Sequence, residues 1–265
     1  MAGKGHGSLD LGSANLGAQG PPGEGGATNF PDTVPFNNDN SIEEVIDYEE
    51  FIYSEDAVAS IEEIIKIKGW TVTNDGAVGL STFAFFNGDL RIECAGAVSN
   101  GVAIFRESNQ LSNNQDILYK AIIRTDDVGM TDVMYFVGIT SGPAAFNLVL
   151  ATAEADITNG LFFAFSQDDD PNWQVRIKST TGSQDVTVDT GVAVVFNTVY
   201  NFEITYNRAT LEVEFFINGV SVHTATMTGN LGSGGVASLF QVIQQAITIT
   251  PLLQCDALYT KSHRQ

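Results

Sequence analysis

Basic residues are scarce in this sequence. Lysine and arginine number 12 against 32 aspartates and glutamates, which gives the 265-residue chain a formal net charge of −20. A nucleic-acid-binding protein needs a basic face, and an anionic membrane surface attracts one as well. The composition therefore argues against both nucleic acid and membrane as partners.

Long apolar runs are also absent. No stretch approaches the ~18 residues that a membrane span needs. The first residues, MAGKGHGSLDLGSANLG, lack the apolar segment of a secretory signal. We therefore expect a protein that is made in the cytoplasm.

Only two cysteines occur, Cys94 and Cys255, each inside a predicted strand. Two buried, reduced thiols are the ordinary interpretation for a cytoplasmically made protein. A disulfide between the first and last strands of a sandwich is the alternative, because the sequence does not give the separation of the two Cα atoms.

What the sequence does contain is period-2 alternation, clearest between Val199 and Met227. Apolar residues such as Ile204 and Phe215 alternate there with Asn201, Glu203, Glu212 and Glu214. Such alternation indicates half-buried antiparallel strands. Asn218-Gly219 between two of the runs is the strongest short-range signal for a β-hairpin. The segment therefore predicts a three-stranded meander.

From Gly69 onward nearly the whole chain alternates in this way, with Gly- and Asn-containing turns between short runs. This pattern is typical of an all-β sandwich or jelly roll. The predicted strands are 69–73, 79–86, 89–95, 101–106, 117–125, 132–140, 146–153, 160–167, 173–179, 184–189, 199–207, 210–218, 220–227, 236–242 and 246–260, the last broken at Pro251.

Residues 1–40 differ in composition. They are rich in glycine and hold four of the seven prolines, with almost no periodic apolar residues. Such a segment cannot bury enough apolar surface to offset the entropy of ordering it. It is either a disordered tail or an extended arm that orders along a partner, and we favour the arm. The chain then divides into the arm, 1–40, and one jelly-roll β-sandwich domain, 41–265.

The start of the second part is acidic. Val45–Tyr53 predicts an entry strand. Ser54-Glu55-Asp56 reads as a helix start, and Ile61, Ile64 and Ile65 follow at helical spacing, so a short helix or turn is expected there.

Five segments carry a family resemblance. They are Tyr48–Ile52, Gly69-Trp70-Thr71, Asn159–Phe163 with Trp173, Val213–Gly219 with His223-Thr224, and Leu253–Tyr259. Together they resemble the concanavalin-A-like (LamG-like) jelly-roll domains of tailed-bacteriophage virion structural proteins, over roughly residues 47–260. The resemblance implies an antiparallel jelly-roll sandwich that projects from a virion while the N-terminal segment attaches it.

This resemblance and the two-part chain predict a non-enzymatic virion structural protein. It would be a capsid decoration, a fibre-like part or a tail-associated component, bound to a capsid or tail protein through residues 1–40 and made in the host bacterial cytoplasm. We expect a homo-oligomer of closed symmetry, for example a trimer. The alternative function is a carbohydrate-binding, lectin-like module for host or surface glycans.

No stretch forms a complete catalytic site. Some concanavalin-like folds are glycoside hydrolases with Glu-x-Asp-x-Glu on one strand. Here Glu154-x-Asp156 is followed by Thr158 where the third acid would stand. Glu212-x-Glu214 falls on the predicted solvent face, and neither a nucleophile elbow nor zinc-ligand spacing is present. The sequence therefore predicts a protein that is not an enzyme.

One acidic loop, Ser166–Trp173, is a candidate ligand site. Asp168, Asp169 and Asp170 could gather carboxylate oxygens around Ca²⁺ next to the aromatic platform of Trp173. The alternative is a polar turn that ends on a core tryptophan. No other cofactor is expected.

Overall fold

The meander predicted between Val199 and Met227 is present as three antiparallel strands. They are β12 (Val199–Tyr206), β13 (Glu212–Ile217) and β14 (Val220–Thr226). Ile204 pairs with Phe215, so the apolar residues of the two strands share the buried face. Asn218 and Gly219 have φ values of 53° and 77°, as a two-residue hairpin turn requires. The prediction is confirmed in its strands and in its hairpin turn.

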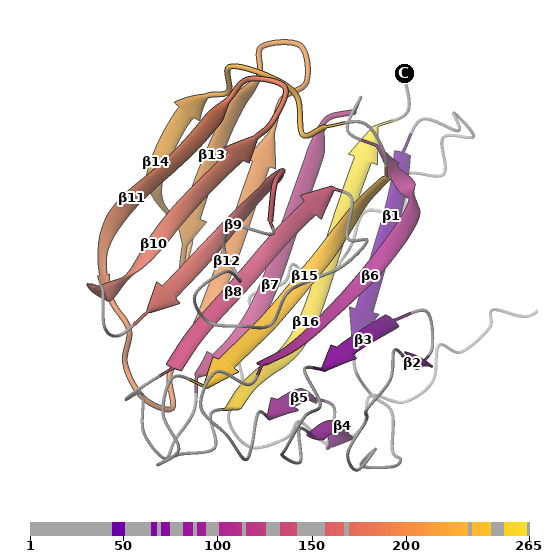
Figure 1. Cartoon of the computed structure of the whole chain (residues 1–265), viewed down its shortest axis with the longest axis vertical. Helices are drawn as coiled ribbons and strands as arrows, with labels where there is room; N and C mark the ends of the chain where they lie inside the picture. The colour runs from indigo at the N-terminus through magenta and orange to yellow at the C-terminus, as the bar shows by residue number, and fades with distance from the viewer. Residues whose placement is uncertain are drawn as a thin grey trace, which may run out of the picture. The chain divides into compact units, whose positions relative to one another are not determined.

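The computed structural model describes most of the chain beyond residue 43. The described residues are 44–50, 65–67, 70–74, 82–86, 89–93, 101–112, 115–125, 133–141, 157–166, 170–232, 235–244 and 252–263. Every regular element in these ranges is a strand, and the strands form two antiparallel eight-stranded sheets (Figure 1). The all-β sandwich is therefore confirmed. None of these elements is a helix that could cross a membrane.

Sheet A contains the meander and lies behind the other sheet in Figure 1. Its order is β14, β13, β12, β7 (Ile117–Thr125), β16 (Leu252–His263), β5 (Asp89–Glu93) and β4 (Thr82–Phe86). The eighth strand, β1 (Glu44–Glu50), pairs with the C-terminal part of β16, whereas β5 pairs with its N-terminal part.

Sheet B faces it. Its order is β11 (Gln184–Ala193), β10 (Asp170–Ser179), β9 (Gly160–Ser166), β8 (Val133–Ser141), β15 (Gly235–Gln244), β6 (Gly101–Ser112), β3 (Trp70–Asn74) and β2 (Ile65–Ile67). The chain passes from β11 in sheet B to β12 in sheet A and returns through β15, which inserts between β8 and β6. This exchange between sheets is the topology of a jelly roll.

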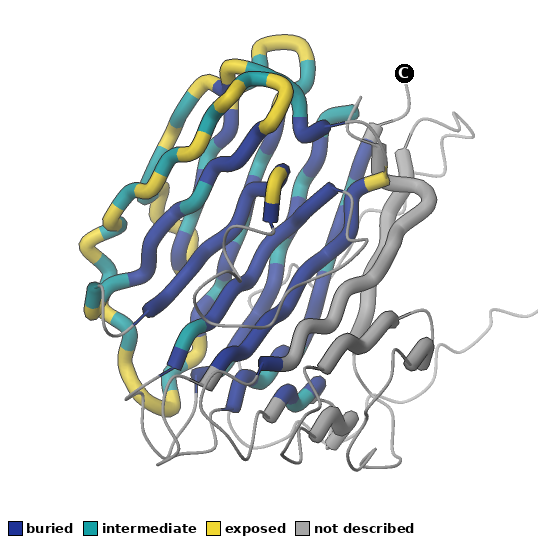
Figure 2. The backbone as a smooth tube through the Cα atoms, in the orientation of Figure 1, coloured by how far each residue is buried: buried dark blue, intermediate teal, exposed yellow. Residues whose placement is uncertain are grey.

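The core lies between the two sheets. Trp173 of β10 is completely buried, and its ring centroid lies 4.8 Å from that of Phe202 and 5.5 Å from that of Tyr200, both on β12. Such edge-to-face pairs add about 0.5–1.5 kcal/mol each to the burial of the rings. Figure 2 shows β8 and β9 buried along their length, while the edge strand β11 alternates between half-buried and exposed residues.

Most predicted strands are confirmed, with small shifts at their ends. One correction concerns Ile65, which was expected at the end of a short helix and instead starts β2, where it pairs with Val72 of β3. Its β-branched side chain suits this hairpin. Residues 51–64 and the predicted strand 146–153 lie outside the described residues. β16 begins at Leu252, directly after Pro251, where a strand break was predicted.

The predicted arm and the predicted state of the two cysteines fall wholly or partly outside the described ranges. Residues 1–40 lie entirely outside them, and the arm stays a prediction. Cys255 is a buried thiol on β16 whose Sγ donates to the carbonyl of Ala257 at 3.6 Å. Cys94 lies outside the described residues, so the structure does not test a bridge between the two.

Candidate functional site

The acidic loop predicted as a ligand site is described in part. The Trp173 side chain points into the core and is completely buried, so its ring is not available as an exposed platform. The alternative interpretation, a turn that ends on a core tryptophan, fits this residue. Asp168 and Asp169 lie outside the described residues, and ligand binding by this loop stays a prediction.

Asp170 is the acid of this loop that the structure describes. Its Oδ1 accepts the backbone N–H of Asn172 at 2.8 Å, which forms a local turn at the start of β10. Asn172 Nδ2 in turn donates to Asp189 Oδ2 on β11 at 3.2 Å. The described residues contain no group of three or more His, Cys, Asp or Glu side chains that could hold a metal. The Ca²⁺ hypothesis therefore has no support from the described part of the loop.

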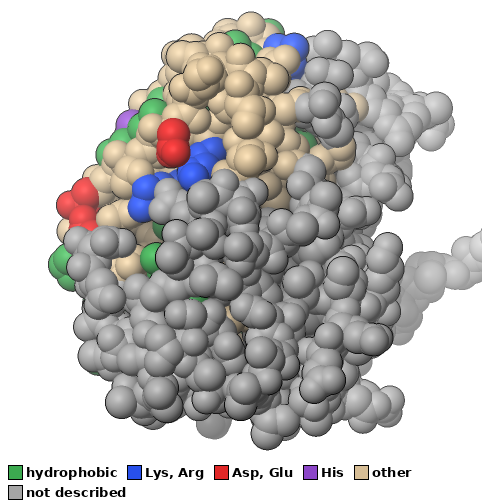
Figure 3. All heavy atoms as spheres, viewed as in Figure 1, with side chains coloured by type: hydrophobic (Ala, Val, Ile, Leu, Met, Phe, Trp, Pro, Cys, Tyr) green, Lys and Arg blue, Asp and Glu red, His purple; other side chains and the backbone are tan. Residues whose placement is uncertain are grey.

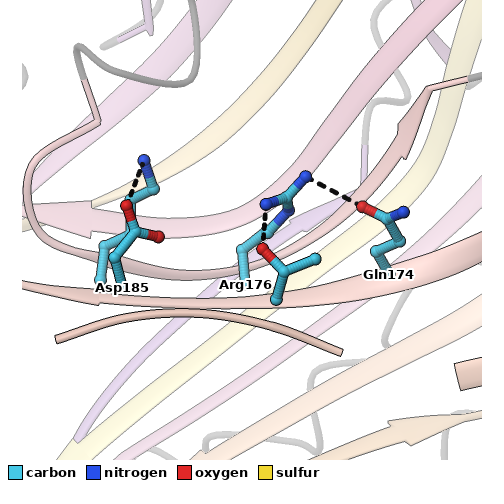
Figure 4. A network of polar contacts seen from close by, with 5 residues as sticks. Gln174, Arg176 and Asp185 are labelled. Atoms are coloured by element: carbon cyan, nitrogen blue, oxygen red, sulfur yellow. Dashed lines mark hydrogen bonds and ion pairs between the residues drawn. The ribbon is translucent and has the colours of Figure 1, made fainter. Parts of the chain in front are cut away.

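A polar network lies on the outer face of sheet B, along β10 and β11 (Figure 4). Arg176 donates to Thr187 on the neighbouring strand and to Gln174 Oε1 at 2.9 Å. Lys178 is almost completely buried, and its Nζ lies 3.6 Å from Asp185 Oδ2. Figure 3 shows basic and acidic side chains next to each other on this face. Because these groups bond to one another, the network fastens β11 to β10.

On the same face, the described strands β8 and β9 carry no acidic residue of the kind that a glycoside hydrolase uses. The outward-facing positions on β8 and β9 are Met134, Phe136, Gly138, Thr140, Gly160, Phe162, Ala164 and Ser166. None of them carries a carboxylate. Glu154 and Asp156, considered as an incomplete catalytic pair, lie outside the described residues.

A groove of about 630 Å³ lies on the outer face of sheet A, which makes it a second candidate site. Its lining residues are Asp116, Ile117, Leu118, Glu203, Thr205, Tyr206, Asn207, Glu212, Val213, Glu214, Thr224 and Lys261. Most of them come from five neighbouring strands, β14, β13, β12, β7 and β16, because side chains in equivalent register positions line up across a sheet, and Asp116 and Asn207 adjoin the ends of β7 and β12. The volume is in the range of small-ligand pockets.

Two neighbouring cross-strand rows of outward-facing residues lie here: the first lines the groove, and the second enters it at Glu203 and otherwise runs beside it. The first row is Thr224, Glu214, Thr205, Leu118 and Lys261. The second row is Phe216, Glu203, Lys120 and Tyr259. In the second row Lys120 Nζ and Glu203 Oε2 form an ion pair of 2.9 Å, and a half-buried aromatic residue lies on each side of it. The face thus combines charged, hydroxyl and aromatic groups on hydrogen-bonded strands.

One end of the groove is fixed by the turn between β12 and β13. Asp116 Oδ1 accepts the backbone N–H of Arg208 at 2.7 Å. Asn207 Oδ1 accepts the N–H groups of Ala209 and Thr210 at 2.9 and 3.1 Å. These bonds hold the turn in one conformation against the end of β7.

The sequence identified only part of this site. Glu212 and Glu214 were predicted on the solvent face, and they do face outward. The lysines of β7 and β16 were missed, although both follow the same period-2 alternation. Which residue lies beside which depends on strand register, and no local pattern specifies the pairing of segments so far apart in the chain.

His223, a histidine of the meander, is a cross-strand pairing residue. It pairs with Phe215 across β13 and β14, and the two ring centroids lie 6.4 Å apart. Burial lowers the pKa of its imidazole. No other titratable side chain is bonded to it among the described residues, so it forms no acid–base pair there.

The chain resembles known proteins in structure but not in sequence. No family model and no curated protein matches the sequence significantly. Solved structures do match: an endo-1,3-β-glucanase from Streptomyces sioyaensis has a TM-score of 0.54 at 11% identity, over 82% of this chain and 95% of that one. Peanut lectin has a TM-score of 0.53 at 13% identity, over 83% and 97%. The potassium-bound Emp46p carbohydrate recognition domain has 0.51 at 10%, over 81% and 98%. The chain has the concanavalin-like jelly-roll fold.

At these identities the likeness establishes the fold alone. The neighbours include glucanases as well as lectins, so the concanavalin-like fold is compatible with an enzyme and with a binding protein. Because one neighbour is a potassium-bound form, ion binding is compatible with this fold as well. None of these named neighbours indicates a bacteriophage virion origin, and that part of the resemblance has no support from them.

Proposed function

We propose that this protein is a lectin-like module that binds glycans without cleaving them, in the groove on the outer face of sheet A. The observation that carries the proposal is the lining of this groove. Carboxylate, hydroxyl, amide and ammonium groups converge there, next to partly exposed rings. Sugars present many hydroxyl groups that both donate and accept hydrogen bonds, and apolar C–H faces that pack on aromatic rings.

The fold supports this function by fixing the polar groups. The lining side chains stand on paired strands of one sheet, and the turn that closes one end is held by Asp116 and Asn207. A preorganised site loses less conformational entropy when a ligand binds. The similarity to solved lectin and glucanase structures is consistent with a sugar ligand.

Binding without cleavage is favoured by how the groove acids are engaged. Glycoside hydrolysis needs two carboxyl groups on either side of the bond, one to protonate the leaving group and one to act as nucleophile or base. Glu203 is already paired with Lys120, and Glu212 Oε2 accepts the hydroxyl of Thr210 at 3.0 Å. Of the four lining acids, Glu214 alone has no such partner among the described residues, so the groove does not present two unengaged carboxyl groups, and the proposal assigns its acids to binding.

A glycan array with the full-length protein, with and without Ca²⁺, tests the proposal. We expect binding that weakens several-fold in Thr224→Val, because a neutral hydrogen bond contributes about 0.5–1.5 kcal/mol. Thr226→Val is the matched control, since Thr226 is exposed on the same strand but does not line the groove. Absence of binding in both conditions, or equal loss in both variants, would exclude this site. Release of reducing ends from a bound glycan at neutral or mildly acidic pH would show an enzyme instead.

The virion role remains a second, sequence-based proposal. It depends on residues 1–40, for which a capsid or tail protein is the expected partner, and on homo-oligomers of unspecified number. A glycan-binding sandwich is compatible with it, because a component exposed on a particle could help that particle adhere to host glycans.

A further inference from the structure

The four carboxylates that line the groove differ in how they are engaged. Three of them have a protein partner. These are Asp116 with the Arg208 N–H (2.7 Å), Glu203 with Lys120 Nζ (2.9 Å) and Glu212 with the Thr210 hydroxyl (3.0 Å). These three carboxylates bond to neighbouring strands and turns and so help to hold them together.

Glu214 is the exception. It stands half-buried on β13, between Thr205 of β12 and Thr224 of β14 in the same cross-strand row. Its carboxylate takes part in no hydrogen bond or ion pair among the described residues. A carboxylate has two oxygens that only accept hydrogen bonds. Among the groove-lining residues, Glu214 therefore offers acceptor capacity that the other described residues do not use.

The charge of the groove decides which ligands can use this acceptor. Four carboxylates line it, whereas Lys261 is the one basic residue among its described lining residues. Lys120 lies beside the groove and is paired with Glu203. The chain as a whole carries a net charge of −20. An acidic sugar would place its own carboxylate or sulfate beside these like charges in a half-buried site, where such repulsion is only partly screened.

We infer that the groove selects non-acidic saccharides, and that Glu214 is the residue that accepts hydrogen bonds from their hydroxyl or ammonium groups. This inference rests on the proposed glycan-binding function. A carboxylate that accepts two neighbouring hydroxyls makes charge-assisted bonds, which are stronger than neutral ones. Uronic acids, sialylated glycans and sulfated glycans are the class that the groove rejects.

The test compares the full-length wild-type protein with Glu214→Gln on a glycan array sorted by charge, followed by calorimetric titration of the strongest binder. The matched control is Asp185→Asn, which removes the same charge from the exposed β11 strand of sheet B. Gln keeps the size of the side chain, and thermal unfolding checks that both variants are folded.

We expect the wild type to bind non-acidic glycans at least about tenfold more tightly than their uronate or sulfate counterparts. Glu214→Gln should weaken the strongest binder by about tenfold or more. Asp185→Asn should leave it unchanged. Unchanged binding by Glu214→Gln, or equal binding of acidic counterparts, overturns the inference while glycan binding itself stands. If the wild type binds no glycan, the proposed function and the inference both fail.

Discussion

Close packing around single residues limits which substitutions this sandwich tolerates. Gly138 of β8 lies opposite Phe162 of β9, whose ring packs edge-on against Phe136 with centroids 5.8 Å apart. A Cβ atom at position 138 would lie 2.3 Å from the carbonyl oxygen of Leu161 and 2.5 Å from the Cα of Phe162. Both are backbone atoms, so the two strands themselves would have to separate.

Gly138→Ala is therefore expected to lower the free energy of unfolding by about 2 kcal/mol or more, as overpacking of a rigid core does. Gly219→Ala is the comparison. Its Cβ would meet nothing within 4 Å, but its φ of 77° costs a non-glycine residue about 1 kcal/mol. Urea unfolding followed by circular dichroism measures both. A smaller loss in Gly138→Ala than in Gly219→Ala would show that β8 and β9 separate easily.

At the scale of elements, the connection from β11 to β12 carries the chain from sheet B to sheet A. The Tyr200 hydroxyl accepts the N–H of Val195 at 2.7 Å and donates to the carbonyl of Ala193 at 3.1 Å. Thr125 Oγ1 of β7 donates to the carbonyl of Val195 at 2.6 Å. Burial raises the pKa of the Tyr200 phenol, so it remains a donor at neutral pH. Two side chains from sheet A thus hold the crossing segment.

Tyr200→Phe should lower the free energy of unfolding by about 1–2 kcal/mol, because it leaves two backbone groups without a partner. Tyr119→Phe is the matched control. The hydroxyl of Tyr119 is buried without a hydrogen-bond partner among the described residues, so its removal is expected to be neutral or slightly stabilising. Chemical denaturation of the two variants measures the difference. Equal effects would mean that Tyr200 does not anchor the crossing.

The sequence predicted the individual strands better than it predicted which strands lie side by side. Alternation and the Asn218-Gly219 turn specified the meander, because both are local signals. The groove could not be predicted in the same way. Glu203 meets Lys120 only through the register of β12 on β7, and Lys261 joins the row only because β16 inserts beside β7. Trp173 shows the same limit, since the sequence left both a core position and a surface platform open.

At the scale of the whole molecule, the described core and the groove are built from the sandwich part of the chain. The buried apolar residues described run from Leu90 to Leu258, and the groove residues run from Asp116 to Lys261. A sandwich of this length is long enough to form its own core.

Deletion of residues 1–40 is therefore expected to leave a soluble β domain, 41–265, that unfolds cooperatively within a few degrees of the full chain and binds the same glycan with the same affinity. Circular dichroism, thermal unfolding and calorimetry measure these properties, with the full-length protein as control.

If residues 1–40 are an attachment arm, the truncated protein should also fail to join the assembly that the full chain joins. Loss of the β spectrum or of cooperative unfolding would place part of the core within residues 1–40, because a sandwich stable by itself would not depend on them. If the truncated protein still joins the assembly, residues 1–40 are not the attachment arm, and the sandwich domain must contact the partner protein.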